Sequence, residues 1–512
     1  MRVAIVAIFL LLALPAQAET LRIGVPSDPT SMDPHFQDLA PNANIARHVF
    51  DALVATGSKS ELQPGLATGW TRTADPAVWE ITLRPGVKFH DGKPFSAEDA
   101  VFSLLRVLVV PNAPNTTGRY VRDLVEIAVV DPHTLRIRTP QPSAILPNNL
   151  SNVPIVSSRV GMAAEPRDFN NGTHMIGTGA YRFVRWTPGS DVALAANPDH
   201  WGGTANWSEV RIRTIPNNGA RLAGLLSGDV DLISALPTTD VARLRAEGKF
   251  AVWDAVSNRD VFWSIDTARA QTPFVTSNDG GPIANPFRDI RVRQAVMLAI
   301  NRKLIVERVM EGMAMPATQL VPIGMTGYDP TIALPEPDPA RARALLAEAG
   351  YPQGFKLTIH TTAGRYPNDQ QQAEAVAQML SRVGIQTQVS ALPVATYFVS
   401  ARKHAFTFNL VSWGFGTGDT YVLVRETLHS RGLENYGSNA NPDIDRALDQ
   451  ALIELDPMRR GQFIADAQRI AAADAAVIPT HYQLNLWASR RNFKLNPRMD
   501  ELTLAQDISA VR

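Results

Sequence analysis

The sequence contains no cysteine, which excludes disulfide bonds, thiolate catalysis and thiolate metal sites. Neither sign of charge is in excess, because 49 Lys and Arg residues balance 49 Asp and Glu residues. Proteins that bind nucleic acids show a basic surplus or basic stripes, so no such partner is expected. A chain of 512 residues, 45% of them hydrophobic, must therefore draw its stability from a large core.

Catalytic and metal-binding motifs are missing as well. The ten histidines include no His-x-His and no His-Glu-x-x-His arrangement, and His360 and His404 are interpreted as structural. There is no Gly-x-Ser-x-Gly elbow and no Walker A loop, and "GTGAYR" and "GFGTGD" lack the spacing of a dinucleotide fingerprint. We expect no enzyme, no metal and no cofactor. A hydrolase site made of scattered residues is the remote alternative.

Long hydrophobic runs are confined to the first eighteen residues. Arg2 precedes an apolar run, Val3 to Leu14, and Ala16-Gln17-Ala18 forms an Ala-x-Ala cleavage site. This pattern is typical of a cleaved secretory signal peptide, and the run is too short to span a bilayer. We expect a mature chain that starts at Glu19, has a net charge near −1 and is soluble in a bacterial periplasm.

The rest of the chain alternates between strand and helix patterns, which predicts an α/β fold. Residues 21–25 read as a buried strand, and residues 42–53 have helical spacing. From about 62 to 174 the pattern changes. "WEITLRPGVKFHDGKPF" and "VEIAVVDPHTLRIRT" read as hairpins, and Ser96 with Asp99 forms a capping box. These features predict a small α+β domain inserted early in the chain.

A second α/β unit begins near residue 285. "DIRVRQAVMLAINRKLIVERVM" has apolar positions at the spacing of one helix face and predicts one helix. The next predicted helix is capped by Asp338, has Pro339 at its first position and stops at Gly350. Strands and helices of a βαβ type follow. Two lobes of this kind commonly close on a ligand by hinge motion.

Several long blocks carry a resemblance to a known family. They include "LQPGLATGWTRTADPAVWEITLRPGVKFHDGKPFSAEDAVFSL", "IGTGAYRFVRWTPGSDVALAANPDHWGG" and "RDIRVRQAVMLAINRKLIVERVMEG". With "DPARARALLAEAGYPQGFKLTIHTTAGRYPND" they cover nearly all of residues 20–490 in order. In these blocks the chain resembles the solute-binding proteins of the peptide/nickel ABC importer family (extracellular solute-binding family 5), which includes dipeptide- and oligopeptide-binding receptors.

The resemblance implies a two-lobed periplasmic-binding-protein fold of the cluster C type, with the small domain inserted in the first lobe. Two crossover segments, expected near 282–288 and 484–492, would join the lobes. The expected divisions are a signal peptide (1–18), a first lobe (19–284, with the insert at about 62–174), a second lobe (285–488) and a C-terminal return to the first lobe (489–512).

The stretch "VSWGFGTGDT", residues 411–420, decides what the resemblance implies for the ligand. In peptide-binding relatives, an aspartate three residues after the tryptophan holds the α-amino group of the ligand. Counted from Trp413, that position is Gly416, so the expected charge is missing. Asp419 would replace it only if the loop takes a different course. The alternative is that Asp419 caps the helix that follows.

Further candidates for ligand contact lie on both lobes. Arg365, in "GRYPND", is close to where dipeptide-binding relatives place the arginine that pairs with the ligand carboxylate. A guanidinium suits this role because it forms two parallel hydrogen bonds to a carboxylate. The alternative is a solvated loop arginine. Trp413 and Phe415 would form an apolar wall or belong to the core, and Ser27 and Met32 are candidates on the opposite lobe.

These features predict a periplasmic substrate-binding protein of an ABC importer. It would capture a peptide or peptide-like solute between its lobes and deliver it to an inner-membrane permease complex. The alternative ligands are a non-peptide acid, an opine or sugar conjugate, and a nickel or iron chelate. We expect a monomer.

Overall fold

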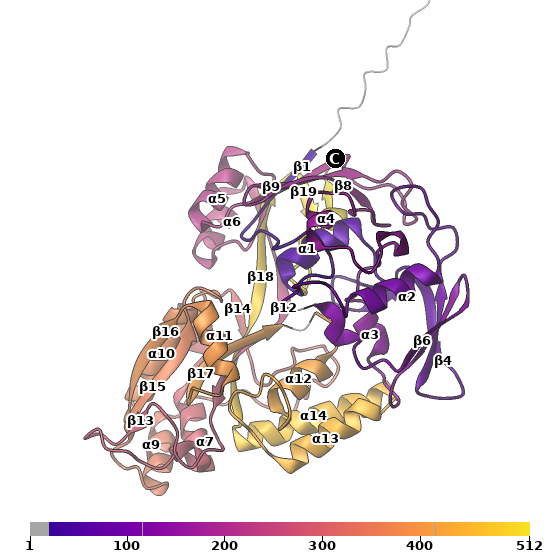
Figure 1. The fold of residues 1–512 in the computed structure, drawn as a ribbon. Helices are drawn as coiled ribbons and strands as arrows, with labels where there is room; N and C mark the ends of the chain where they lie inside the picture. Colours follow the sequence, from indigo (N-terminus) through magenta and orange to yellow (C-terminus); the bar gives the residue numbers. More distant parts are fainter. Residues whose placement is uncertain (1–19, 115, 415, 512) are drawn as a thin grey trace, which may run out of the picture.

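The computed structural model describes residues 20–511 except Asn115 and Phe415, so the predicted signal peptide lies outside it. Within the described residues, twelve strands form one sheet that runs through both halves of the molecule (Figure 1). These strands are β1 (Thr20–Val25), β8 (Tyr181–Thr187), β9 (Asp191–Ala196), β10 (Glu209–Thr214), β11 (Leu232–Ser234), β12 (Phe250–Ile265), β13 (Val275–Thr276), β14 (Ala314–Pro316), β15 (Phe355–Thr362), β16 (Ile385–Leu392), β17 (Phe408–Gly414) and β18 (Val477–Arg490). Their order is β13-β15-β17-β12-β18-β11-β1-β10-β9-β8, with β16 beside β15 and β14 beside β18.

The first half of the sheet is built around β1, which confirms the strand predicted at residues 21–25. Leu21 and Ile23 are fully buried in its core, and β1 pairs in parallel with β10 and β11. A burial this complete is expected for a central parallel strand covered on both faces. The helices of this half are α1 (Ala40–Val49), α2 (Ala97–Arg106), α3 (Leu146–Leu150), α4 (Pro166–Asn170), α5 (Asn218–Ser227) and α6 (Val241–Glu247).

A separate four-stranded sheet lies within the segment predicted as an insert. Its order is β4-β5-β7-β6, and α2 begins at the capping box of Ser96 and Asp99, as predicted. The predicted β6–β7 hairpin is also present. The other predicted hairpin is reduced to an isolated bridge between Lys88 and Pro94, because both edges of β5 pair with β4 and β7. The short strands of the molecule are β2 (Val54–Thr56), β3 (Leu62–Pro64), β4 (Ala67–Arg72), β5 (Val78–Leu83), β6 (Glu126–Asp131), β7 (Thr134–Arg138), β19 (Phe493–Leu495) and β20 (Ile508–Ala510).

The second half carries the remaining helices, and one sequence prediction is wrong there. The single helix expected from residue 289 onward is two helices, because Ile300 is extended and Asn301 caps a new helix through the backbone N–H of Leu304 (2.9 Å). The cap and Pro of the next helix are confirmed at Asp338 and Pro339. The helices are α7 (Ile290–Ala299), α8 (Arg302–Arg308), α9 (Pro339–Glu348), α10 (Asp369–Ser381), α11 (Val394–Arg402), α12 (Thr420–Leu428), α13 (Pro442–Ile453) and α14 (Pro457–Asp474).

Two long antiparallel strands, β12 and β18, connect the halves (Figure 1). Their pairing is interrupted by a register shift between Val256 and Asp260. The crossover expected near 282–288 packs instead on the second half, where Asn285 donates to the carbonyls of Asp266 (2.9 Å) and Arg269 (3.0 Å). We therefore propose that the lobes divide at this register shift and at the facing part of β18, and we call the two halves the first and second lobe.

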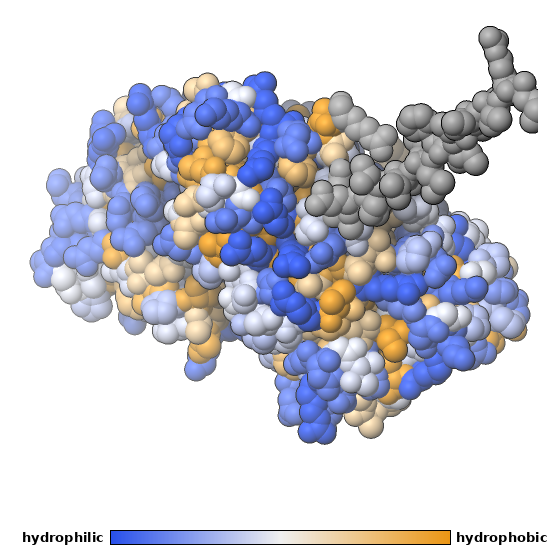
Figure 2. All heavy atoms as spheres, turned by 90° about the horizontal axis from the view of Figure 1, so that it is seen from above, coloured by the Kyte–Doolittle hydropathy of each residue, from blue (hydrophilic) through white to orange (hydrophobic). Residues whose placement is uncertain are grey.

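Hydrophobic and hydrophilic residues are mixed on the face of the molecule that Figure 2 shows. On the face seen from above, hydrophobic residues lie in small groups between hydrophilic ones (Figure 2). Among the residues that the structure describes, no helix combines the length and the apolar character that a membrane span requires.

Candidate functional site

The predicted tryptophan wall lies at the end of β17. Trp413 is half-buried and packs against the hydrophobic core of the second lobe, so it is partly core and partly open. In the sheet it faces Asp260, and the next residue, Gly414, faces Arg259. β17 therefore ends beside the register shift that joins the lobes. Phe415, the other predicted wall residue, lies outside the described residues.

The glycine loop after β17 contacts the first lobe. Gly416 is exposed, and a Cβ on it would lie 3.2 Å from Oδ1 of Asn152. Asn148 donates a hydrogen bond to the carbonyl of Thr417 (3.0 Å). Gly418 has a φ of 67°, and a Cβ there would lie 2.4 Å from the Ser60 carbonyl oxygen, so glycine is required. The position of the missing carboxylate thus faces the opposite lobe.

Asp419 acts as a helix cap and an ion-pair partner. Its carboxylate accepts the backbone N–H of Tyr421 (2.9 Å) at the start of α12. Arg460 of α14 donates to both oxygens, at 2.7 and 2.9 Å. The side chain is only 10% exposed, so both oxygens are engaged away from a ligand. The capping alternative is confirmed, and the structure gives no support to Asp419 as a replacement anchor.

Arg365 lies in the loop after β15 and is exposed. Its guanidinium carbon is 5.4 Å from the ring centre of Tyr366. The Asp369 carboxylate organises the loop, since it accepts the backbone N–H groups of Gly364 (3.1 Å), Arg365 (2.9 Å) and Tyr366 (3.3 Å). Among the described residues, no carboxylate lies within ion-pairing distance of the Arg365 guanidinium. Its positive charge is therefore available to a ligand.

An ion pair that the sequence did not suggest lies beside this group. Nε of Arg259 is 2.6 Å from Oε1 of Glu501, and Nη2 is 3.2 Å from Oε2. Ser257 donates to the same carboxylate at 3.3 Å. Burial raises the pKa of Glu501, but Arg259, Arg365 and Ser257 together hold that pKa below its usual value. Both arginines therefore act on one carboxylate.

Tyr366 lies beside Arg365 and reaches the backbone of Ser412, the residue before Trp413. Burial raises the pKa of Tyr366, while Arg259, Arg365 and the Ser412 backbone oppose the increase. Tyr366 is only 5% exposed. The site thus combines a loop of the second lobe, the end of β17, the register shift in the middle of β12 and the C-terminal segment of the first lobe.

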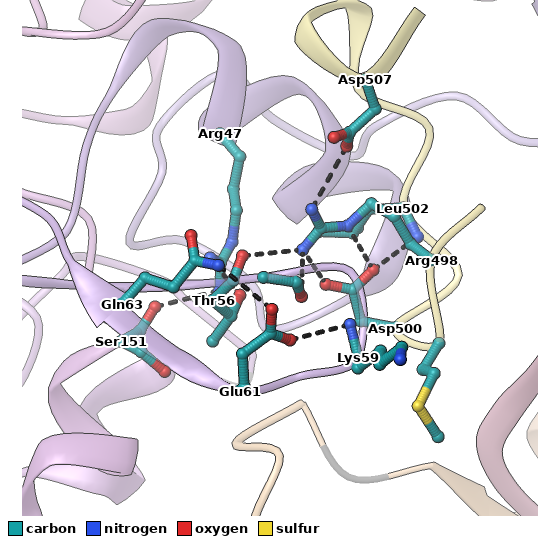
Figure 3. A network of polar contacts seen from close by, with 12 residues as sticks. Arg47, Thr56, Lys59, Glu61, Gln63, Ser151, Arg498, Asp500, Leu502 and Asp507 are labelled. Carbon is teal, nitrogen blue, oxygen red and sulfur yellow. Dashed lines mark hydrogen bonds and ion pairs between the residues drawn. The ribbon is translucent and has the colours of Figure 1, made fainter. Parts of the chain in front are cut away.

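A network around Arg498 holds that C-terminal segment in place (Figure 3). Arg498 pairs with Asp500 (2.6 Å) and Asp507 (3.2 Å) and donates to the carbonyls of Thr56 (3.1 Å) and Gly57 (3.2 Å). The next residue, Met499, accepts the backbone N–H of Asn258 (3.1 Å). The segment therefore links the turn after β2 to the hinge strand β12, directly before Glu501.

Two other predicted residues are not part of this group. Met32 is 3% exposed and packs in the core of the first lobe, so it is closed to a ligand in this structure. Ser27 is exposed, but it is next to Asp28, whose carboxylate accepts from Gly189 (2.8 Å) and Thr214 (2.9 Å). These contacts place Ser27 near the turn between β8 and β9 and the end of β10 in the first lobe. Within the part of the chain that the structure describes, no hydrogen bond or ion pair connects Ser27 to Trp413 or Arg365.

Metal chemistry has no support in the described residues. In residues 20–511 without positions 115 and 415, no group of three or more His, Cys, Asp and Glu side chains could hold a metal ion. His360 is structural, as interpreted from the sequence: it is 3% exposed and lies 4.4 Å from Phe274 and 4.3 Å from Phe406 between ring centres.

His360 also predicts how stability depends on pH. Burial lowers its pKa from 6.5 to about 4, so the native state resists protonation that the unfolded state accepts. Stability from this group is full above pH 6.5 and is lost as the pH falls towards 4. We expect His360→Phe to reduce the loss of unfolding free energy between pH 7.5 and pH 5 by about 2 kcal/mol. Urea denaturation at both pH values measures this, and an equal loss in parent and variant would reject it.

Comparisons with known proteins match this architecture. The family described as "Bacterial extracellular solute-binding proteins, family 5 Middle" matches residues 61–435. The glutathione-binding protein of Salmonella typhi is 27% identical over 491 residues, which cover 91% of this chain and 90% of the relative. The periplasmic murein peptide-binding protein of Escherichia coli (strain K12) is 25% identical over 501 residues, which cover 92% of this chain and 89% of the relative.

Solved structures agree on the fold. The structure of HbpA2 from Haemophilus parasuis gives a TM-score of 0.81 at 22% identity and covers 96% of this chain and 99% of that one. The unliganded open form of a periplasmic murein tripeptide-binding protein gives a TM-score of 0.79 at 24% identity. The match covers 97% of this chain and 98% of that one. The predicted α/β fold of periplasmic binding proteins is thereby confirmed.

Proposed function

The chain belongs to the bacterial extracellular solute-binding proteins of family 5, and from this premise we propose that it captures a peptide or peptide-like acid between its lobes and delivers it to an ABC permease in the inner membrane. Proteins of this family bind substrate and are not enzymes. The proposal extends to this chain what the names of its relatives state, namely binding of glutathione and of murein peptide.

The single observation that carries the choice of an acid is Arg365. This guanidinium is exposed and has no acidic partner among the described residues. A carboxylate of the ligand would supply the missing charge through two parallel hydrogen bonds. The partly open face of Trp413, the residue after Ser412 whose backbone Tyr366 reaches, would hold the apolar part of the ligand.

Position 416 narrows the proposal further. Because this residue is glycine, the wall after Trp413 has no carboxylate to receive an α-amino group, and Asp419 is occupied by Arg460. An ammonium group buried there without a partner would bear a large desolvation cost. We therefore favour N-blocked or otherwise bulky acids over plain dipeptides. Non-peptide acids fit the same requirement.

The proposed setting is the periplasm. It rests on the relatives, one of which is named as periplasmic, and on the pattern of a signal peptide in residues 1–18. We also propose that the protein is a monomer and that it has no nucleic-acid partner, since its charges balance.

Native mass spectrometry of protein released from cells by osmotic shock tests the function. We expect a chain that starts at Glu19, with a small acidic solute bound in one-to-one ratio. On denaturation the solute should be recovered unchanged, because a receptor releases its ligand without chemistry. Recovery of a hydrolysed product, or of a chain with Met1 in the membrane fraction, would contradict the proposal.

A further inference from the structure

Arg259 occupies a particular place at the junction of the lobes. It lies in β12 within the register shift and faces Gly414 at the end of β17. A Cβ on Gly414 would lie 3.4 Å from Nη2 of Arg259, so the guanidinium is directly beside the strand that carries Trp413. Its side chain is 13% exposed. Arg259 is therefore a charged residue in the wall of the proposed site.

The guanidinium is held by one edge only. Nε and Nη2 bond the two oxygens of Glu501, a bidentate arrangement that fixes the plane of the group. In the part of the chain that the structure describes, Nη1 has no hydrogen-bond partner, and it is not among the fully enclosed atoms. Glu501 therefore fixes the orientation of the Arg259 guanidinium, while Nη1 remains free to donate hydrogen bonds to a ligand.

Two guanidinium groups and one ion-paired carboxylate meet at this point. Arg259 and Arg365 both act on Glu501, and both also act on Tyr366. The Glu434 carboxylate also acts on Tyr366, and it keeps its negative charge while it accepts the hydroxyl hydrogen of Tyr436. Glu501 forms its direct ion pair with Arg259, so among the described residues the Arg365 guanidinium has no carboxylate at ion-pairing distance and can receive one from a ligand.

Glu501 is held in an unusual backbone conformation. Its φ is 67°, in the left-handed region that residues other than glycine and asparagine seldom adopt. Such strain persists only where the surroundings determine it, and it is common at binding sites. Here the Met499 carbonyl accepts hydrogen bonds from Asn258 (3.1 Å) and Ser257 (3.4 Å). Arg498 donates to the carbonyl of Thr56 in the turn after β2. The whole segment presents the Glu501 carboxylate to Arg259.

We propose that Arg259 is a second carboxylate-binding residue of the site and that Glu501 is the positioning residue that orients it. The ligand would then carry net negative charge, as an N-blocked or acidic peptide does, and its acid groups would lie between Arg259 and Arg365. This inference rests on the proposed function and adds to it the charge of the substrate.

Calorimetry with N-acetyl-Ala-Ala (net charge −1) and Ala-Ala (net charge 0) tests the proposal. The parent protein should prefer the acetylated peptide, and Arg259→Gln should weaken its binding by about tenfold or more. Arg259→Lys keeps the positive charge but cannot form two parallel hydrogen bonds to a carboxylate, so it should weaken binding of the acetylated peptide by about threefold or more. As a control, Arg293→Gln removes an ion pair of similar exposure, that with Asp474, and should leave affinity unchanged.

The variant Glu501→Gln separates positioning from simple electrostatics. Removing a negative charge beside an anion site should strengthen binding of the acetylated peptide if charge alone matters. If Glu501 orients Arg259, binding should weaken instead, by about threefold or more. Thermal denaturation confirms that each variant is folded.

The outcomes distinguish this inference from the proposed function. Unchanged affinity in Arg259→Gln, together with lost affinity in Arg365→Ala, would overturn the role of Arg259 and leave the function intact. Stronger binding by Glu501→Gln would overturn the positioning role. If the parent protein binds neither peptide, the proposed substrate class fails, and with it Arg259 as an anchor for peptide carboxylates.

Discussion

Replacing Arg365 by alanine should weaken ligand binding by roughly 2–5 kcal/mol, the usual cost of truncating one member of a desolvated charge pair. The loss is expected to be large because the Arg365 guanidinium has no acidic partner of its own among the described residues. A ligand carboxylate would be its main partner, and the variant would leave that carboxylate enclosed without one. Calorimetry on the solute found by native mass spectrometry, or on N-acetyl-Ala-Ala, measures the effect.

The stability of the ligand-free protein should hardly change in this variant. Asp369 organises the loop through backbone N–H groups, and these remain when the Arg365 side chain is removed. Arg446→Ala is the matched control: it removes an arginine, 66% exposed, from α13 of the same lobe, and affinity should stay as in the parent. Equal affinity in Arg365→Ala and the parent would reassign Arg365 to the solvated surface.

Local signals explain which parts of the fold were predictable from sequence. The capping box of Ser96 and Asp99 and the cap at Asp338 use side chains within three residues of the backbone groups they bind. The break between α7 and α8 was missed because the apolar spacing continues across it. Asn301, a good capping residue, was the available signal.

The site was predictable only in part, because its charged residues meet through tertiary structure. Arg365 and Trp413 belong to motifs that the family resemblance marks. Arg259 and Glu501 are 242 positions apart, and no sequence spacing relates them. The one local signal was a charged pair, Arg259-Asp260, inside an otherwise strand-like run. For Asp419, the sequence left capping and ligand binding open, and only the position of Arg460 decides between them.

Asp260 shows why a charged pair inside a strand-like run, here Arg259-Asp260, indicates a functional segment. Asp260 is fully buried and pairs with Trp413 on the neighbouring strand, and neither carboxylate oxygen has a hydrogen-bond partner among the described residues. Burial raises the pKa of Asp260 well above its usual value. An unpaired carboxylate is costly in a core. Its presence at the lobe junction, next to Arg259, fits a segment whose residues serve more than packing.

Gly416→Asp should reverse the preference of the protein between blocked and free peptides. The variant restores a carboxylate three residues after Trp413, where peptide-binding relatives hold the α-amino group. We expect affinity for Ala-Ala to rise and affinity for N-acetyl-Ala-Ala to fall, each by about tenfold or more. The backbone permits the change, since Gly416, unlike Gly418, has no positive φ.

The environment of residue 416 sets the conditions of this test. A Cβ would lie 3.2 Å from Oδ1 of Asn152, so the asparagine must move by a few tenths of an ångström. Gly416→Asn has the same shape without the charge and therefore separates crowding from electrostatics. Calorimetry should show the gain for Ala-Ala in the aspartate variant alone. Micromolar or tighter binding of Ala-Ala by the parent would mean that another carboxylate anchors the amino group, and Glu434, beside Tyr366, would then be the first to replace.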